Sequence, residues 1–273
     1  MIDLNFKYKD AIAFLKKKSP FTPDVAIVLG SGLGSFADST KKVKTIPTTE
    51  IPKFPSAMVE GHKGLIHFAK IGNKKLIIFQ GRLHFYEGYN LGDCILPILL
   101  AKKIGCNKII LTNAAGGINK NLKPGDLMIA DSFNATNIKK ELTELIGISS
   151  LEAKNNFFNC PSLRMNKVFK MAATEIGILL HAGTYWYTKG PNYETPAEIE
   201  MISRFGGDAA GMSTVHEAVF ASSINMEVAI VSCITNMASG ILPQKLSHTE
   251  VTETAKNSAD KFAFLLKTAI SRL

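Results

Sequence analysis

A glycine-rich segment follows the first strongly apolar run of the chain. The run, Val25–Leu29, predicts a buried strand, and Gly30-Ser31-Gly32-Leu33-Gly34-Ser35 comes directly after it. Glycines at the end of a strand allow a tight turn and bring backbone N–H groups close to an anion. The third glycine comes one residue too early for the dinucleotide fingerprint G-x-G-x-x-G, and Glu50, near the spacing of its ribose-binding acid, lies in a proline-rich stretch. The segment therefore indicates an anion-binding loop, with a turn that binds nothing as the alternative.

Three further polar clusters come where a predicted strand ends. They read QGRLHFYEGY from Gln80, TNAAGG from Thr112 and TNMASG from Thr235. Ligands of open α/β sheets bind beyond the carboxyl ends of the strands, so these clusters are expected to converge on one site. Arg82 and His84 share one side of an extended segment, where a guanidinium and an imidazole suit a tetrahedral oxyanion. A surface ion pair and a structural histidine are the alternatives.

Several single residues have both a functional and a structural interpretation. His62 lies in the glycine-flanked EGH, which suits a mobile gate or a simple turn, and it shares no strand face with His67, which argues against a metal pair. Glu194 follows GPNY and suits either a ligand acceptor or a charge at a helix start. Asn236 ends an apolar strand, where an amide needs a partner, or it forms an Asx turn. In GMST, the methionine is expected in the core and the serine as a helix N-cap.

Composition and charge restrict the class of protein. The 273 residues are 46% hydrophobic and 20% charged, and Lys+Arg 32 against Asp+Glu 23 gives a net charge of +9. This balance suits anionic partners, but the lysines are scattered and no basic run alternates with aromatics, so we expect no nucleic-acid partner. No apolar run reaches membrane-spanning length and no signal peptide is recognisable, so we expect a cytoplasmic protein without a membrane partner. The four separated cysteines favour a reducing compartment over zinc or disulfides.

Predicted strands and helices alternate along the chain. Strands are predicted at 25–29, 64–71, 74–81, 126–130, 181–188 and 227–235, with another entering a glycine turn within 108–117. Helices are predicted at 6–18, 93–104, 163–176, 196–205, 215–224 and 249–273, while 132–160 lacks a clear period. This alternation predicts a layered α/β fold. No linker or repeat divides the chain, so one domain over residues 1–273 is expected.

Seven segments together resemble the trimeric purine nucleoside phosphorylases. They are LGSGLGSF, EGHKG, QGRLHFYEGY, LTNAAGGIN, KGPNYETPAEI, GMSTVHE and ITNMASGI, in the family order from about residue 25 to 250. The resemblance implies a single α/β domain with a central mixed sheet flanked by helices, and a homotrimer. It implies cleavage of the N-glycosidic bond of purine (deoxy)ribonucleosides, with inorganic phosphate as co-substrate and with neither a cofactor nor a metal.

The same resemblance assigns roles to matching positions. The phosphate contacts would be Ser31, His62, Arg82, His84, the Ala114 backbone N–H and Ser213. The ribose contacts would be Tyr86, Met212, His248 and Phe158, with Phe157 a rival for the aromatic residue that reaches the neighbouring subunit. The base contacts would be Ala115, Tyr193, Glu194, Ala210 and Asn236. Of these, Asn236, Glu194 and His84 would be catalytic, because Asn236 can donate to the departing purine while Glu194 accepts from its N1–H.

Two positions favour 6-oxopurines over 6-aminopurines. Related methylthioadenosine phosphorylases carry Asp at the position of Asn236 and an apolar residue at that of His248. Inosine, guanosine and their deoxy forms are therefore the expected substrates. The alternatives are a methylthioadenosine or adenosine phosphorylase, a nucleoside-binding protein without catalysis and, with least support, a dehydrogenase. The chain departs from the family at 132–160 and at His216, where proline is usual.

Overall fold

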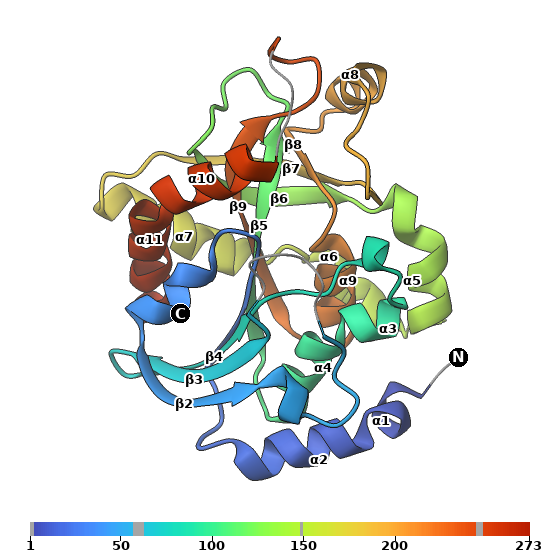
Figure 1. The fold of residues 1–273 in the computed structure, drawn as a ribbon, viewed down its shortest axis with the longest axis vertical. Helices are drawn as coiled ribbons and strands as arrows, with labels where there is room; N and C mark the ends of the chain where they lie inside the picture. Colours follow the sequence, from blue (N-terminus) through green and yellow to red (C-terminus); the bar gives the residue numbers. More distant parts are fainter. Residues whose placement is uncertain (1–2, 57–62, 148–149, 244–247) are drawn as a thin grey trace.

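A mixed β-sheet runs through the molecule and carries helices on both faces (Figure 1). The computed structural model describes residues 3–56, 63–147, 150–243 and 248–273. The strands found there are β1 Val25–Leu29, β2 Lys41–Pro47, β3 Leu65–Ile71, β4 Lys74–Gln80, β5 Lys108–Gly117, β6 Leu127–Asn134, β7 Leu180–Tyr187, β8 Ala209–Gly211 and β9 Glu227–Met237. Their order is β2-β3-β4-β1-β5-β8-β7-β6-β9. The predicted α/β class with a central mixed sheet is confirmed, and one sheet holds all these strands. The extent of the domain over residues 1–273 stays a prediction.

β5 is the strand from which the sheet closes on itself. It pairs with β1 in parallel, with β8 antiparallel and with β9 in parallel, so that β5, β8, β7, β6 and β9 form a closed ring. The β5–β9 register places Ala115 opposite Ile234 and Gly116 opposite Asn236. The TNAAGG and TNMASG clusters therefore lie side by side. The expectation that they follow the strands was wrong, because β5 continues through all of TNAAGG and β9 continues through the first three residues of TNMASG.

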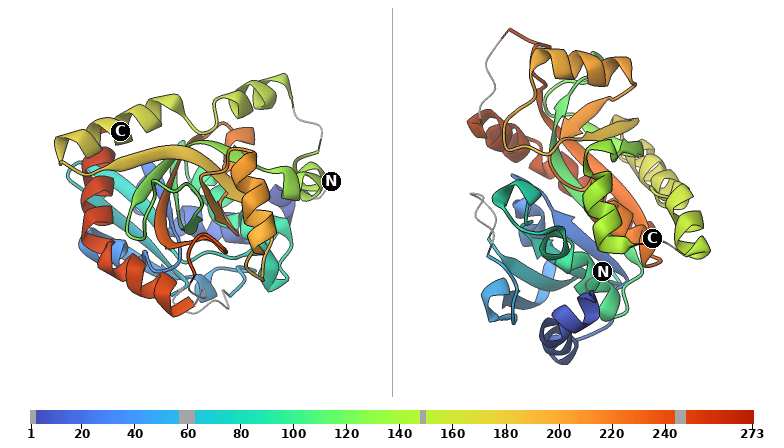
Figure 2. Two further views of the ribbon diagram at one scale, coloured as in Figure 1. Left: turned by 90° about the horizontal axis from the view of Figure 1, so that it is seen from above. Right: turned by 90° about the vertical axis from the view of Figure 1, so that its right-hand side faces the viewer.

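Helices cover the two faces and one end of the sheet (Figure 2). Their bounds are α1 Leu4–Lys7, α2 Lys9–Lys18, α3 Leu91–Cys94, α4 Leu96–Lys103, α5 Lys139–Ile146, α6 Leu151–Phe158, α7 Leu163–Glu175, α8 Pro196–Arg204, α9 Val215–Ser223, α10 His248–Asn257 and α11 Ala259–Arg272. One hydrophobic cluster joins the sheet to α2, α4 and α9, and a second joins it to α7 and α11. A small third cluster places α8 against β7 and β8.

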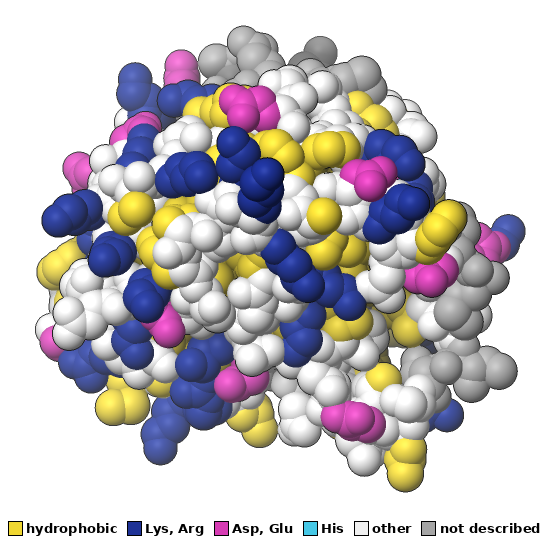
Figure 3. Space-filling view, turned by 90° about the horizontal axis from the view of Figure 1, so that it is seen from below, with side chains coloured by type: hydrophobic (Ala, Val, Ile, Leu, Met, Phe, Trp, Pro, Cys, Tyr) yellow, Lys and Arg dark blue, Asp and Glu magenta, His cyan; other side chains and the backbone are white. Residues whose placement is uncertain are grey.

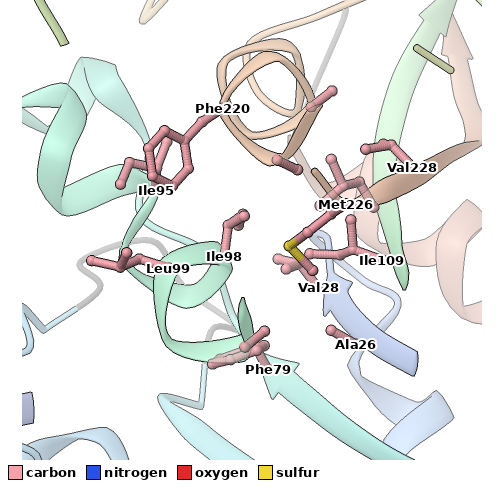
Figure 4. Close-up of a cluster of buried hydrophobic side chains, with 14 of the residues drawn as sticks. Ala26, Val28, Phe79, Ile95, Ile98, Leu99, Ile109, Phe220, Met226 and Val228 are labelled. Carbon is pink, nitrogen blue, oxygen red and sulfur yellow. The ribbon is translucent and has the colours of Figure 1, made fainter. Parts of the chain in front are cut away.

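β1 is buried on both faces, as its uninterrupted apolar sequence predicts. Val28 belongs to the cluster beneath α4 and α9, where Ile98, Ile109 and Met226 lie around it (Figure 4). Ile27 belongs to the cluster on the other face. Each such side chain stabilises the fold by about 1.5–3 kcal/mol when fully buried. The strand that ends at the glycine-rich loop is therefore firmly positioned.

Several predicted helices are divided where tertiary contacts compete with the helical period. The helix expected at 6–18 breaks at Tyr8, whose ring is buried and whose hydroxyl donates to Asp93. The helix expected at 93–104 begins earlier and breaks at Ile95, and the one at 249–273 breaks at Ser258. The segment 132–160, without a clear period in sequence, contains α5 and α6.

Two strands were not predicted. β2 lies within a stretch whose sequence is lysine-rich and mostly exposed, and it pairs antiparallel with β3 at the edge of the sheet. Lysines on an edge strand hinder its pairing with other chains. They also interrupt the alternation of apolar and polar residues by which a strand is recognised in a sequence, so β2 was missed. β8 is only three residues long and is defined by its partners β5 and β7.

Basic side chains are distributed over the face below α2 and β2, with acidic ones among them (Figure 3). The last turn of α2 carries Lys16, Lys17 and Lys18, and β2 begins with Lys41 and Lys42. Lys42 forms an ion pair of 2.6 Å with Asp38.

Candidate active site

One cavity gathers polar segments from the carboxyl ends of β1, β4, β5 and β9 and from the loop before α8. Its empty volume is about 740 Å³, which includes the space at its mouth that is open to solvent. Twelve of the predicted site residues line it: Ser31, Arg82, His84, Tyr86, Ala114, Ala115, Tyr193, Glu194, Ala210, Met212, Ser213 and Asn236. The convergence expected from strand ends is thus observed, although the role of each side chain stays a prediction.

The glycine-rich loop is held against β5 through Gly30. A Cβ atom at this position would lie 2.7 Å from the Asn113 Cα and 2.8 Å from the Thr112 carbonyl oxygen, so that only glycine allows the approach. The Thr112 hydroxyl accepts a hydrogen bond from Gly30 N at 3.1 Å and donates to the Val28 carbonyl at 3.0 Å. These contacts place Ser31 on the cavity wall.

Arg82 follows β4 and is 2% exposed. Its Nε donates to Oε2 of Glu217 at 2.9 Å, and its Nη1 donates to the Thr112 carbonyl at 2.7 Å. The surface ion pair considered for Arg82 is thus wrong, because the pair is buried. These two hydrogen bonds hold the planar guanidinium group in one orientation. The Arg82 side chain lines the cavity, where a guanidinium suits the recognition of an oxyanion.

His84 is oriented by a carboxylate three residues later. Oε1 of Glu87 accepts from the His84 backbone N–H at 2.7 Å and lies 3.0 Å from its Nδ1, across the short helix η3 Phe85–Glu87. Burial lowers the pKa of His84, and the Glu87 hydrogen bond opposes that shift. The ring also stacks on Tyr86 with 4.8 Å between centroids. His84 therefore has both a structural partner and a place on the cavity wall.

Ser213 lines the cavity, and Thr214 follows it behind the wall. The Ser213 hydroxyl lies 3.0 Å from that of Thr214, which accepts from Nδ2 of Asn113 at 3.1 Å. The N-cap of α9 is Thr214, at φ 76°, so the expectation that Ser213 caps this helix was wrong. Met212 is half-buried on the cavity wall, where we had expected a core residue.

Asn236 and Glu194 lie in the same cavity. Asn236 is 5% exposed and inside β9; its Oδ1 accepts from Thr235 Oγ1 at 2.9 Å, and its Nδ2 donates to the Met237 carbonyl at 3.0 Å. Within the described residues the amide donates only this bond, so its second N–H can donate to a ligand. Glu194 Oε1 is buried and has no hydrogen-bond partner within the described part of the chain, so it can accept from a ligand donor.

The apolar wall consists of small residues, Met212 and two tyrosines. Tyr193 is 44% exposed at the cavity, and burial raises the pKa of Tyr86 to about 12, which keeps its hydroxyl protonated at neutral pH. Small residues of β5 and β8 leave room for a flat ring. A Cβ at Gly116 would lie 3.5 Å from Nδ2 of Asn236, which is an ordinary van der Waals contact.

Three predicted site residues are not placed in this cavity. His62 lies outside the described residues. His248 is the first residue of α10, and nothing is described of its side chain. Phe158 is 84% exposed at the end of α6 and is absent from the cavity wall, while its rival Phe157 packs against Phe133 with 6.0 Å between ring centroids. A single chain does not test a contact with a neighbouring subunit.

Sequence reasoning missed six residues of the cavity wall: Asn113, Gly116, Thr235, Ala238, Gly211 and Val251. The first four belong to the TNAAGG and TNMASG clusters, whose position at the predicted strand ends already indicated a site. Val251 comes from α10, and nothing in its sequence indicates a site. Glu217 was missed as the partner of Arg82.

Neither a membrane span nor a cluster of metal ligands is found in the part of the chain that the structure describes. No helix there is long and apolar enough to cross a membrane. No group of three or more His, Cys, Asp or Glu side chains could hold a metal ion within the same residues.

Comparison with known sequences identifies relatives over nearly the whole chain. The model of a family described as the phosphorylase superfamily matches residues 24–271. Purine nucleoside phosphorylase 1 of Geobacillus stearothermophilus is 40% identical over 269 residues, which cover 97% of each chain. Purine nucleoside phosphorylase 1 of Bacillus subtilis is 37% identical over 268 residues, or 96% of this chain and 97% of the relative.

Solved structures show the same fold. Schistosoma mansoni purine nucleoside phosphorylase in complex with inosine superimposes with a TM-score of 0.89 at 32% identity, over 100% of this chain and 98% of that one. A Schistosoma purine nucleoside phosphorylase in complex with guanosine gives 0.86 at 30%, over 100% and 99%. The Schistosoma mansoni protein in complex with adenosine gives 0.88 at 33%, over 98% and 97%.

Proposed function

Since the chain belongs to the phosphorylase superfamily and, within it, to the purine nucleoside phosphorylases, we propose that it cleaves 6-oxopurine (deoxy)ribonucleosides with inorganic phosphate. The products are the free base and (deoxy)ribose 1-phosphate. Inosine and guanosine are the expected substrates, and relatives have been solved with each of them.

One observation carries this proposal: a single cavity is lined by the buried guanidinium of Arg82 and by Glu194, one of whose carboxylate oxygens is buried with no hydrogen-bond partner among the described residues. Arg82, Ser31 and Ser213 offer donors to a tetrahedral anion, and Glu194 offers an acceptor to a ring N–H. A nucleoside between them would meet phosphate at its sugar and Glu194 at its base. This is the arrangement that phosphorolysis requires.

The chemistry follows from where charge develops. As the N-glycosidic bond lengthens, the sugar becomes cationic and the purine gains electrons, as in other glycosyl transfers. Phosphate held by Arg82 and His84 supplies the nucleophilic oxygen and negative charge beside the sugar. Asn236 donates to the purine near N7 and O6, while Glu194 accepts from N1–H. Placed donors of this kind each contribute about a hundredfold in rate, and no covalent intermediate with the enzyme is needed.

A phosphorylase for 6-aminopurine nucleosides is the alternative, because a relative has been solved with adenosine. A neutral amide at position 236 favours the 6-oxo group, to which it donates, over the 6-amino group, which is itself a donor. Glu194 likewise requires a ring N–H, which adenine lacks at N1. Both residues support inosine and guanosine.

We extend the proposal to a cytoplasmic homotrimer that needs no metal or cofactor. The exposed Phe158 supports contact with another copy, because a phenylalanine at the surface loses the benefit of burial unless a partner covers it. Four free cysteines, three of them buried, fit a reducing compartment. Sedimentation of the purified protein tests the trimer, cell fractionation tests the location, and activity after dialysis against a chelator tests the requirement for metal.

The decisive experiment compares inosine, guanosine, adenosine and methylthioadenosine, each with and without phosphate. Release of base from the first two, only with phosphate, is the expected result. Preferential turnover of the last two would overturn the base assignment and keep the phosphate site. Binding of purine with no turnover of any of the four would identify a nucleoside-binding protein.

A further inference from the structure

The segment that departs from the family pattern packs against the core near the cavity. Its short helix η4 Thr136–Ile138 leads into α5, and Ile138 and Leu142 belong to the core cluster that also contains residues of α3 and α9. Figure 1 shows α5 on the same side of the sheet as these two helices. The core packing of Ile138 and Leu142 therefore fixes the position of α5, so that its exposed side chains can bind a neighbouring segment.

Two side chains of this segment reach the end of β7. Oε1 of Glu141 accepts from Nζ of Lys189 at 2.7 Å, and Nδ2 of Asn137 donates to the Tyr187 carbonyl at 3.3 Å. The Glu141 side chain is 19% exposed and that of Lys189 is 46% exposed. Burial raises the pKa of Glu141, but the hydrogen bond and charge of Lys189, a backbone hydrogen bond and the charge of Lys140 together outweigh burial, and the pKa lies below its ordinary value. The pair is thus charged at neutral pH.

Lys189 immediately precedes a residue that touches the cavity wall. Gly190, at φ 65°, lies so close to Met212 and Tyr86 that a Cβ atom would be 2.4 Å from the Met212 sulfur and 3.1 Å from Cδ1 of Tyr86. On the strand side, Thr188 N donates to the Gly211 carbonyl at 3.0 Å. A displacement of Lys189 would therefore move the backbone against Met212.

The chain then runs from Gly190 to Tyr193 and Glu194, both on the cavity wall. Within the described residues, no hydrogen bond joins 190–194 to another segment. The ion pair with Glu141 is thus the last polar side-chain anchor before the carboxylate proposed to read the base.

We propose that Glu141 is a positioning residue for the nucleoside site, which acts through Lys189 to hold the segment 190–194 in place. The inference rests on the proposed function, because it assigns the ion pair a part in binding the base and ribose. The phosphate side of the cavity is held separately, by Gly30, Thr112 and Glu217, so the ion pair acts on one substrate only.

The test measures KM for inosine and for phosphate in the full-length variants Glu141→Gln, Lys189→Met and the two combined. We expect KM for inosine to rise about three- to fivefold in each variant. This is the change in affinity expected from the loss of one partly exposed ion pair at the upper end of the usual range of interaction energies. KM for phosphate should be unchanged. The double variant should be no worse than either single one, because both remove the same interaction. Lys189→Arg should behave as the parent chain.

A matched control is the ion pair between Lys170 of α7 and Asp131. Lys170 is also 46% exposed, its Nζ lies 3.0 Å from the carboxylate, and neither residue lines the cavity. Lys170→Met should leave both KM values unchanged. Hypoxanthine binding, followed by the fluorescence of Trp186, the only tryptophan in the sequence, should weaken in Glu141→Gln by the same factor as KM for inosine.

The outcomes separate the two proposals. If the parent chain cleaves inosine with phosphate and the variants show unchanged KM for inosine, or equal changes for both substrates, the positioning role is wrong and the proposed function stands. Additive effects in the double variant would also reject it. If the parent chain does not cleave inosine, the proposed function fails and the inference fails with it.

Discussion

The guanidinium Nε of Arg82 donates to Oε2 of Glu217 across 2.9 Å, and neither side chain is more than 1% exposed. Burial raises the pKa of Glu217, and the charge of Arg82 opposes that shift. Burying this ion pair costs desolvation energy, so we infer that its role is to orient the guanidinium of Arg82. Glu217 holds the Nε edge of that group, and the side chain lines the cavity.

Glu217→Gln tests that orientation. The amide keeps the shape but replaces a hydrogen bond between charged groups, which contributes ~1.5–3 kcal/mol, so we expect KM for phosphate to rise about tenfold. KM for inosine should change little. Initial rates over a range of phosphate concentrations give the answer. A fall in KM for phosphate would show that the negative charge of Glu217, and not its hold on Arg82, dominates.

Asn236→Ala should lower kcat for inosine by about a hundredfold, because it removes a donor to the departing purine. KM should change less, since the bond strengthens only in the transition state. Single-turnover measurements separate the chemical step from product release. A rate within twofold of the parent chain would exclude this role.

Asn236→Asp should shift preference toward 6-aminopurine nucleosides. A carboxylate accepts from the 6-amino group and repels the 6-oxo group, so the ratio of kcat/KM for adenosine to that for inosine should rise by at least about tenfold. The same substrate panel measures it. An unchanged ratio would place selectivity elsewhere in the cavity.

Glu194→Gln should reduce kcat/KM for inosine by about two orders of magnitude. The amide replaces a charged acceptor and can turn an N–H toward the ring N–H of the base, which leaves buried donors unpaired. KM for phosphate should be unaffected, because we propose that Glu194 contacts the other substrate. Equal losses for both substrates would indicate that the variant has disturbed the whole cavity.

His216 is expected to make stability depend on acid pH. Both ring nitrogens are buried without a hydrogen-bond partner in the described structure, and burial lowers its pKa to about 3. The unfolded chain binds the proton near pH 6.5 and the folded chain does not, so this contribution to stability is complete at neutral pH. It should fall by up to about 1.4 kcal/mol per pH unit between about 6.5 and 3.

His216→Pro provides the comparison for that slope. Proline is tolerated in the first turn of a helix, and His216 is the second residue of α9. Urea unfolding at several pH values should give a shallower decline for the variant than for the parent chain. Parallel declines would assign the acid sensitivity to other groups.

Local sequence was sufficient for the elements whose signals are local. β1, β3, β4, α7 and α8 lie within about two residues of their predicted bounds, and the turn at Gly72 joins β3 to β4 as predicted. Thr195 caps α8 through the N–H of Glu198, as its position before a first-turn proline predicts. Signals of this kind act over one turn or one strand, so the chain carries them whatever surrounds them.

The sequence by itself thus determined the α/β class, the family and most of the residues on the cavity wall, because motif order and apolar periodicity are properties of the chain. Only the tertiary structure decided that Arg82 meets Glu217, 135 residues away, that β5 and β9 run side by side, and that α5 reaches Lys189. Such pairings depend on which distant segments the core brings together, and a buried charge reveals its partner only once that core is formed.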